Sequence, residues 1–434
     1  MTAERTGEAA EHPAQEQEPE PEKGRELEKA TDWLRLALIV GAVVAIGFTT
    51  SLSVLAIIVA LVFMIFMHEL GHYVTARWAG MKVTEFFIGF GPRLWSFRKG
   101  ETDYGLKPIP AGAYVRIIGM TNLEEVDPAD EARTYRQKSF PRRVSVAVAG
   151  SAMHFLMAIA LVFTVLVGFG VADGSSDRWT VGEISGIEGG PVPAAEGGLQ
   201  LGDRIVEVDG QHFADYSAMR TYLRAHPGQA VRLVVERDGA QIALEPRLAS
   251  IDDAGTQVGF LGIRPTYDLV KEGPVGGLVE SVKLTGETMW LSVKGIGTLF
   301  SPSGLEGYVN TLTSGDNPDT AAGAADEEMR PSSLVGIVRT GSQAANAGIA
   351  HVLYFLFVIN VFIGVFNLTP VLPFDGGHVA IAVYERIRSR QGRRYFADVT
   401  KLLPLTYAVV AVLALLFVSS VWLDVVRPAD NIFQ

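Results

Sequence analysis

The sequence predicts a polytopic α-helical membrane protein with a β-rich domain inserted between its helices. Three observations support this fold class. The apolar residues make up 48% of the chain and gather in a few dense blocks, as they do in membrane proteins. The loops between these blocks differ strongly in Lys and Arg content. The long polar segment after the third block alternates strand-like runs with turn residues.

Four blocks are predicted to be core transmembrane helices, because about 20 apolar residues are needed to cross a bilayer. A shorter block, 33–50, precedes them. It is either an extra span, which we favour, or an interfacial stub joined to the next helix through Phe48–Ser53. The four core blocks are Leu52–Phe66, Val144–Val171, Val352–Leu368 and Leu402–Trp422.

The basic residues give the orientation of these spans. The loop 77–143 holds twelve Lys and Arg residues and the segment 386–401 holds six, so both are predicted to be cytoplasmic. The segment 173–265 has more acids than bases and should lie outside. The tail 1–32 is predicted to be disordered. It is cytoplasmic if 33–50 spans and external if it does not.

Composition also excludes several kinds of protein and site. There is no cysteine, which excludes disulfides, thiolate metal sites and a cysteine nucleophile. The net charge is −11, and the tail alone, with ten acidic and four basic residues, contributes −6. Outside the membrane-flanking loops no basic face stands out, so a nucleic-acid partner is not expected.

A His-Glu-x-x-His motif ends the first core block. His68 and His72 are one helical turn apart and share a face, where two imidazoles can bind one Zn²⁺. Glu69 beside them is placed to take a proton from an attacking water. The alternative, a helix that carries these residues by chance, leaves costly polar groups inside an apolar segment.

Asp375 is the expected third ligand. It follows the fourth block at a depth similar to that of His68, after a stretch interrupted by prolines. The alternative is an aspartate that only caps the next helix. His154 and His378 are rival ligands, which we interpret as packing or supporting residues. Asn367, eight residues before Asp375, is expected either to stabilise an oxyanion or to have a packing role.

These motifs resemble the site-2 proteases, the intramembrane zinc metalloproteases, and most closely those of actinobacteria. The resemblance rests on HELGH, NLTPVLPFDGGH and ERIR and covers roughly 52–426. It implies a zinc endopeptidase with His68, His72 and Asp375 as ligands, Glu69 as catalytic residue and Asn367 beside them. Its implied substrates are single-span membrane proteins, such as anti-sigma factors or signal-peptide remnants. The location that it implies is the plasma membrane of a bacterium. The chain departs from the family at "AGSAMH", where Ser151 and His154 replace the usual residues.

The resemblance divides the chain into two protease halves, 52–172 and 350–426, with inserted segments. Residues 179–265 resemble a PDZ domain, and a helix over Tyr216–Ala225 and a hairpin turn at Arg237–Gly239 are expected there. The family implies that this domain filters substrates by size, and a plain spacer is the alternative. The segment 270–330 is expected to be an amphipathic surface helix followed by a polar linker.

The loop 77–143 is predicted to be β-rich. We expect Tyr104–Met120 to form a membrane-dipping hairpin whose edge holds the substrate as an added strand. The expected substrate-binding residues are Ala113, Tyr114, Val115 and Arg116.

Two other hypotheses for the function are a scaffold with a structural metal, which has no need of Glu69, and a proton-coupled transporter, which would show internal repeats. The ligand types favour zinc and leave iron and cobalt open.

Overall fold

The structure, a computed structural model, describes residues 51–120, 124–172, 179–186, 192–253, 256–267, 269–313, 330–389 and 394–427. The predicted tail 1–32, the predicted extra span 33–50 and most of the predicted linker lie outside these residues.

Within the described residues, four helical segments are long and apolar enough to cross a membrane, as predicted for the core. They are α2 (Leu52–Trp78), α3 (Phe140–Thr164) continued by η2 (Val165–Phe169), α10 (Ile349–Asn367) and α12 (Leu403–Val426) preceded by η3 (Val399–Leu402). At most a third of each apolar window is buried, so lipid must cover the remaining apolar surface.

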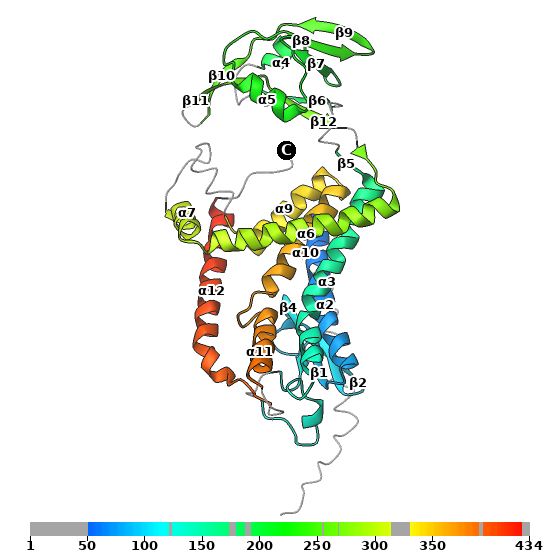
Figure 1. Cartoon of the computed structure of the whole chain (residues 1–434), viewed down its shortest axis with the longest axis vertical. Helices are drawn as coiled ribbons and strands as arrows, with labels where there is room; N and C mark the ends of the chain where they lie inside the picture. Colours follow the sequence, from blue (N-terminus) through cyan, green and yellow to red (C-terminus); the bar gives the residue numbers. More distant parts are fainter. Residues whose placement is uncertain are drawn as a thin grey trace, which may run out of the picture.

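Three of these helices form the packed centre of the membrane part (Figure 1). α2 and α10 both contact α3, and the contact between α3 and α10 is built from buried apolar side chains such as Ala158, Phe357 and Val361. α12 stands to one side of this group in Figure 1 and contacts α9 (Leu334–Ala347) near one end.

A four-stranded sheet follows α2 in the chain. Its strands are β1 (Val83–Phe90), β2 (Trp95–Lys99), β3 (Thr102–Leu106) and β4 (Ile109–Ile117), in the order β2-β3-β1-β4. β3 is parallel to β1 and β4 is antiparallel to it.

The predicted hairpin over Tyr104–Met120 is therefore wrong, because β1 lies between β3 and β4. The short connection crosses the end of β1 at Gly89, where a Cβ would lie 2.5 Å from the Lys107 carbonyl oxygen. Gly89 also has a positive φ of 90°, which glycine adopts without strain. β4 nevertheless forms one edge of the sheet as the described residues order it.

The inserted β-rich domain lies beyond the ends of the helices in Figure 1. It contains α4 (Pro193–Glu196), α5 (Tyr216–Arg224) and the strands β6 (Trp179–Ile184), β7 (Arg204–Val208), β8 (Leu233–Arg237), β9 (Ala240–Leu244), β10 (Ala249–Asp253), β11 (Thr256–Phe260) and β12 (Ile263–Tyr267). Its own core includes Trp179, Leu223 and Leu233. The hairpin turn predicted at Arg237–Gly239 is confirmed: Arg237 pairs with Ala240, and Asp238 and Gly239 both have positive φ.

A short ladder of β5 (Val171–Ala172) and β13 (Leu269–Val270) joins this domain to the helices. α6 (Pro274–Leu299) then runs across the membrane helices in Figure 1 and contacts α3 and α10. It exposes large apolar side chains, among them Val275, Val279 and Trp290, as expected for a helix lying in the membrane interface. α7 (Pro302–Thr313), α9 and α11 (Asp375–Arg388) complete the described helices.

Candidate metal centre

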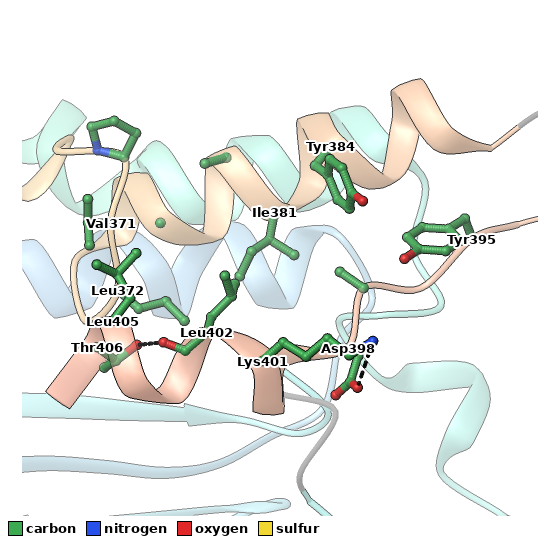
Figure 2. A pocket seen from close by; sticks show the side chains of 14 residues that line it. Val371, Leu372, Ile381, Tyr384, Tyr395, Asp398, Lys401, Leu402, Leu405 and Thr406 are labelled. Atoms are coloured by element: carbon green, nitrogen blue, oxygen red, sulfur yellow. Dashed lines mark hydrogen bonds and ion pairs between the residues drawn. The ribbon is translucent and has the colours of Figure 1, made fainter. Parts of the chain in front are cut away.

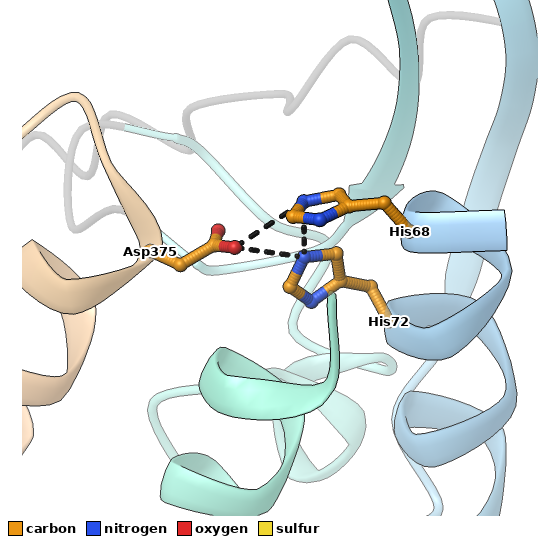
Figure 3. A group of neighbouring side chains, drawn as sticks. All are labelled: His68, His72 and Asp375. Atoms are coloured by element: carbon orange, nitrogen blue, oxygen red, sulfur yellow. Dashed lines mark hydrogen bonds and ion pairs between the residues drawn. The ribbon is translucent and has the colours of Figure 1, made fainter. Parts of the chain in front are cut away.

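α2 and α11 together bring three ligand-type side chains to one point (Figure 3). His68 and His72 project from consecutive turns of α2 and are 8% and 6% exposed. Asp375 is the first residue of α11. The two imidazole Nε2 atoms are 3.2 Å apart, and the Asp375 Oδ2 lies 3.3 Å from that of His68 and 3.2 Å from that of His72. Among the described residues these three form the group that could hold a metal ion.

The hydrogen bonding of His72 fixes which atoms face the centre. Its Nδ1 lies 2.8 Å from the Val146 carbonyl oxygen in α3. A carbonyl only accepts, so Nδ1 carries the proton and Nε2 presents its lone pair. Such a bond from the distal nitrogen is the usual support of a metal-binding histidine.

The triangle of donor atoms fits a small cation. Two neutral imidazole nitrogens and a carboxylate oxygen would repel one another at this distance unless a cation or proton lay between them. Ligands bound to zinc at about 2.0–2.1 Å in a tetrahedron are separated by about 3.3–3.4 Å. The observed separations of 3.2–3.3 Å agree with this spacing, so these three residues would hold a zinc ion.

Two glycines let α3 cover the histidines closely. A Cβ on Gly150 would lie 2.3 Å from Cε1 of His68 and 2.5 Å from Nε2 of His72. A Cβ on Gly71 would lie 2.7 Å from the Ala149 carbonyl oxygen. The close packing of α3 on the two histidine rings therefore requires glycine at these two positions, because real Cβ atoms essentially never lie so close to another atom.

Two further glycines position Asp375. A Cβ on Gly376 would lie 2.1 Å from the Leu368 carbonyl oxygen, and one on Gly377 would lie 2.6 Å from the Leu372 nitrogen. The start of α11 is thus folded tightly against the end of α10. Asn367 is the last residue of α10 and lies in this same turn region, next to the residue that Gly376 contacts.

Glu69 is half-buried on α2. β4 packs against the helix that carries Glu69. The sheet edge is therefore next to the predicted catalytic residue.

The other predicted substrate-binding residues, Ala113, Tyr114 and Arg116, have side chains that hold β4 in place. Ala113 is buried. The Tyr114 hydroxyl donates to Glu85 at 2.5 Å, and Arg116 donates to Glu124 at 2.6 Å. Burial, followed by the bond to Glu85, raises the pKa of Tyr114. The side chains of Tyr114 and Arg116 are thus held by Glu85 and Glu124.

The rival histidines lie beside the centre. His154 is fully buried, with its ring 5.1 Å from that of His68. Its Nδ1 bonds the Asn360 Oδ1 at 2.9 Å, and Asn360 donates to the Leu356 carbonyl oxygen. His378 packs near Tyr135, with ring centroids 6.4 Å apart. Neither belongs to the ligand group.

Sequence reasoning missed an ion pair that supports α11. Arg143 of α3 and Glu385 of α11 are 2.5 Å apart and nearly buried. The second Glu385 oxygen accepts from the Ala397 nitrogen at 2.7 Å. This pair holds α11, the helix that Asp375 begins, against α3. The ERIR motif contains Glu385, but nothing in its spacing identifies a partner 242 positions away.

Comparisons with known proteins show the family of this chain. The sequence model described as Peptidase family M50 matches residues 56–413. Zinc metalloprotease Rip1 of Mycolicibacterium smegmatis is 33% identical over 421 residues, which cover 89% of this chain and 99% of that protein. Zinc metalloprotease Rip1 of Mycobacterium tuberculosis H37Rv is 31% identical over 422 residues, covering 89% of this chain and all of that protein.

Proposed function

Because this chain belongs to peptidase family M50, the site-2 proteases, we propose that it is a zinc-dependent endopeptidase that cuts the membrane-spanning segments of single-span proteins. The observation that carries the proposal is the meeting of Asp375 with His68 and His72, which lie in α2, a segment long and apolar enough to span a membrane. A cluster of two imidazoles and a carboxylate is expensive to keep in such a place without a function.

Each residue of the centre has a role in the proposed reaction. His68, His72 and Asp375 would hold the zinc, which when bound polarises the scissile carbonyl and makes water more acidic. Glu69 takes the proton from the attacking water and returns it to the leaving amide nitrogen. The Val146 carbonyl keeps His72 in the tautomer that binds metal. Asn367 is proposed to donate to the oxyanion that develops on the substrate.

The sheet edge beside Glu69 suggests how a helical substrate reaches the centre. A helix hides its amides in its own hydrogen bonds, so the substrate must become extended before attack. We propose that it adds to β4 as a further strand along Ala113, Tyr114, Val115 and Arg116, using backbone hydrogen bonds. Strand addition would hold the substrate in an extended conformation without requiring a particular sequence of side chains.

We propose that the inserted domain is PDZ-like and lies outside the plasma membrane, opposite the basic loops. A cavity of about 710 Å³ lies between α5 and residues 259–265, with Arg220, Phe260 and Arg264 among its lining. A basic groove of this kind suits an extended peptide with a carboxylate. The domain would then admit substrates already trimmed outside the membrane, with anti-sigma factors or signal-peptide remnants as the proposed class.

The test is cleavage of a single-span substrate by the purified chain in liposomes. Glu69→Gln should lower the rate by about 100-fold or more while the protein still contains one zinc per chain. Asp375→Asn should lose the zinc as well. Glu306→Gln, an exposed change on α7, is the matched control and should leave both unchanged. Undiminished cleavage by Glu69→Gln would overturn the proposed mechanism.

A further inference from the structure

A second cavity, of about 350 Å³, lies between α11 and the start of α12 (Figure 2). It is separate from the metal centre because α11 forms the wall between them. Asp375, His378 and Glu385 face α3 and its neighbours. Gly377, Ile381 and Tyr384, at other positions around the same helix, line the cavity. No role in the proposed reaction uses this space.

The cavity changes character along its length. Figure 2 shows the apolar side chains of Val371, Leu372 and Leu405 at one end. The rings of Tyr384 and Tyr395 and the polar side chains of Asp398 and Lys401 lie toward the other end. This polar end adjoins the basic segment 386–401, and the apolar end points into the membrane part of α12.

The polar mouth carries a net positive charge. The Arg388 guanidinium lies 5.1 Å from the ring centroid of Tyr395 and 5.9 Å from that of Tyr384, both of which line the cavity. The Lys401 side chain is 81% exposed, and its nearest acid is Asp398 at 3.8 Å. Asp398 also accepts from the Thr400 nitrogen and hydroxyl, so the mouth holds two cations, Arg388 and Lys401, and one carboxylate that is already hydrogen-bonded.

We propose that this cavity binds an anionic phospholipid, with one acyl chain between α11 and α12 and the phosphate at Arg388 and Lys401. An apolar slot with basic groups at its membrane-surface end matches both parts of such a molecule. The volume lies in the range of small-molecule pockets. A substrate helix is about 10–12 Å wide with its side chains and would not fit. The proposal goes beyond the proposed peptidase function and does not depend on cleavage.

The experiment uses the full chain in phosphatidylcholine vesicles with a trace of photoactivatable lipid, followed by peptide mapping of the labelled sites. Phosphatidylglycerol with a diazirine in one acyl chain should label the peptides that contain 371–372 and 402–406. The same probe with a phosphatidylcholine head group should label them about tenfold less, because basic side chains near the membrane surface attract an anionic head group more than a zwitterionic one. Unlabelled phosphatidylglycerol should compete.

Three variants test whether labelling depends on this cavity or on surface charge in general. Arg388→Gln with Lys401→Gln should lower cavity labelling by about tenfold. The control, Lys99→Gln with Arg142→Gln, removes two exposed cations elsewhere and should change it little. Ala380→Phe should fill the cavity and block labelling while the charges of Arg388 and Lys401 stay in place.

Equal labelling by both head groups, or an equal loss in the control pair, would overturn the proposal. So would labelling that a single-span substrate displaces and phosphatidylglycerol does not, because the cavity would then be part of the substrate path. All of these measurements can be repeated in the Glu69→Gln protein. Failure of the peptidase proposal would therefore be visible separately from failure of the lipid proposal.

Discussion

Gly150→Ala should disable the metal centre although it adds one methyl group and changes no ligand. The added Cβ would lie 2.3 Å from His68 Cε1, 2.5 Å from His68 Nε2 and 2.5 Å from His72 Nε2. Ordinary contacts of a Cβ begin at 3.4 Å. Either α3 or both rings must therefore move by about 1 Å, the difference between the contact distance and the present separations.

The size of the effect follows from this displacement. Metal sites tolerate changes in ligand distance of about 0.2 Å, so a shift of about 1 Å exceeds the tolerance several-fold. A misplacement of about 1 Å near a reacting centre costs about 100-fold in rate. We expect zinc affinity and cleavage each to fall by about 100-fold or more. The fold should survive, because α3 keeps its other contacts with α10.

The assay measures zinc per chain in purified protein by elemental analysis, together with cleavage in liposomes. Gly168→Ala is the matched control. It makes the same substitution in the same membrane segment, and a Cβ there would meet nothing within 4 Å. It should retain zinc and activity.

Full zinc content and full activity in Gly150→Ala would refute the reasoning. That result would mean that the close approach of α3 to the two rings is not a feature of the working protein. Unfolding of Gly150→Ala, detected as loss of a cooperative thermal transition, would equally contradict the expectation of a local effect.

Three further predictions concern other parts of the chain. Glu385→Gln leaves Arg143 buried without its counter-charge and should cost about 3–5 kcal/mol, seen as a lower melting temperature that Arg143→Met partly restores. In the inserted domain, burial raises the Asp203 pKa, but the bonds from Arg237 and from a backbone amide outweigh it and leave the pKa below its ordinary value. Because this pKa is lower in the folded state, the stabilisation is complete above the ordinary aspartate pKa and is lost as the pH falls through the folded value. Hydrogen exchange of β7 and β8 should therefore quicken at low pH, and less so in Asp203→Asn. Val115→Pro removes a backbone donor from β4 and should abolish cleavage while zinc is retained; full activity would exclude strand addition at this edge.

The parts of the centre that the sequence predicts are those set by local geometry. The spacing of His68 and His72 places them on one face of any helix, and apolar block lengths bring Asp375 to a similar depth. The span count for the core follows from block length in the same way. These inferences need no knowledge of which segments pack together.

The features that the sequence did not predict depend on contacts between distant segments. Adjacent strand-like runs joined by a short turn favour a hairpin. Here the connection between β3 and β4 instead crosses the end of β1, close to Gly89. Gly150 has no special spacing that would mark it as the residue facing both histidines. Arg143 and Glu385 are ordinary charged residues until α11 is packed against α3. Packing partners of this kind are fixed by tertiary structure, which periodicity does not report.

The two histidines and the aspartate of the centre are far apart along the chain. His72 and Asp375 are 303 positions apart, with the whole inserted domain between them. At a synthesis rate of about 5–20 residues per second, about 15–60 s pass between the emergence of the histidines and that of the aspartate. A ribosome that stalls or a transcript that ends early therefore releases a product without a complete centre. The set of metal ligands is complete only after α10 has been made, one span before the end of the helical core.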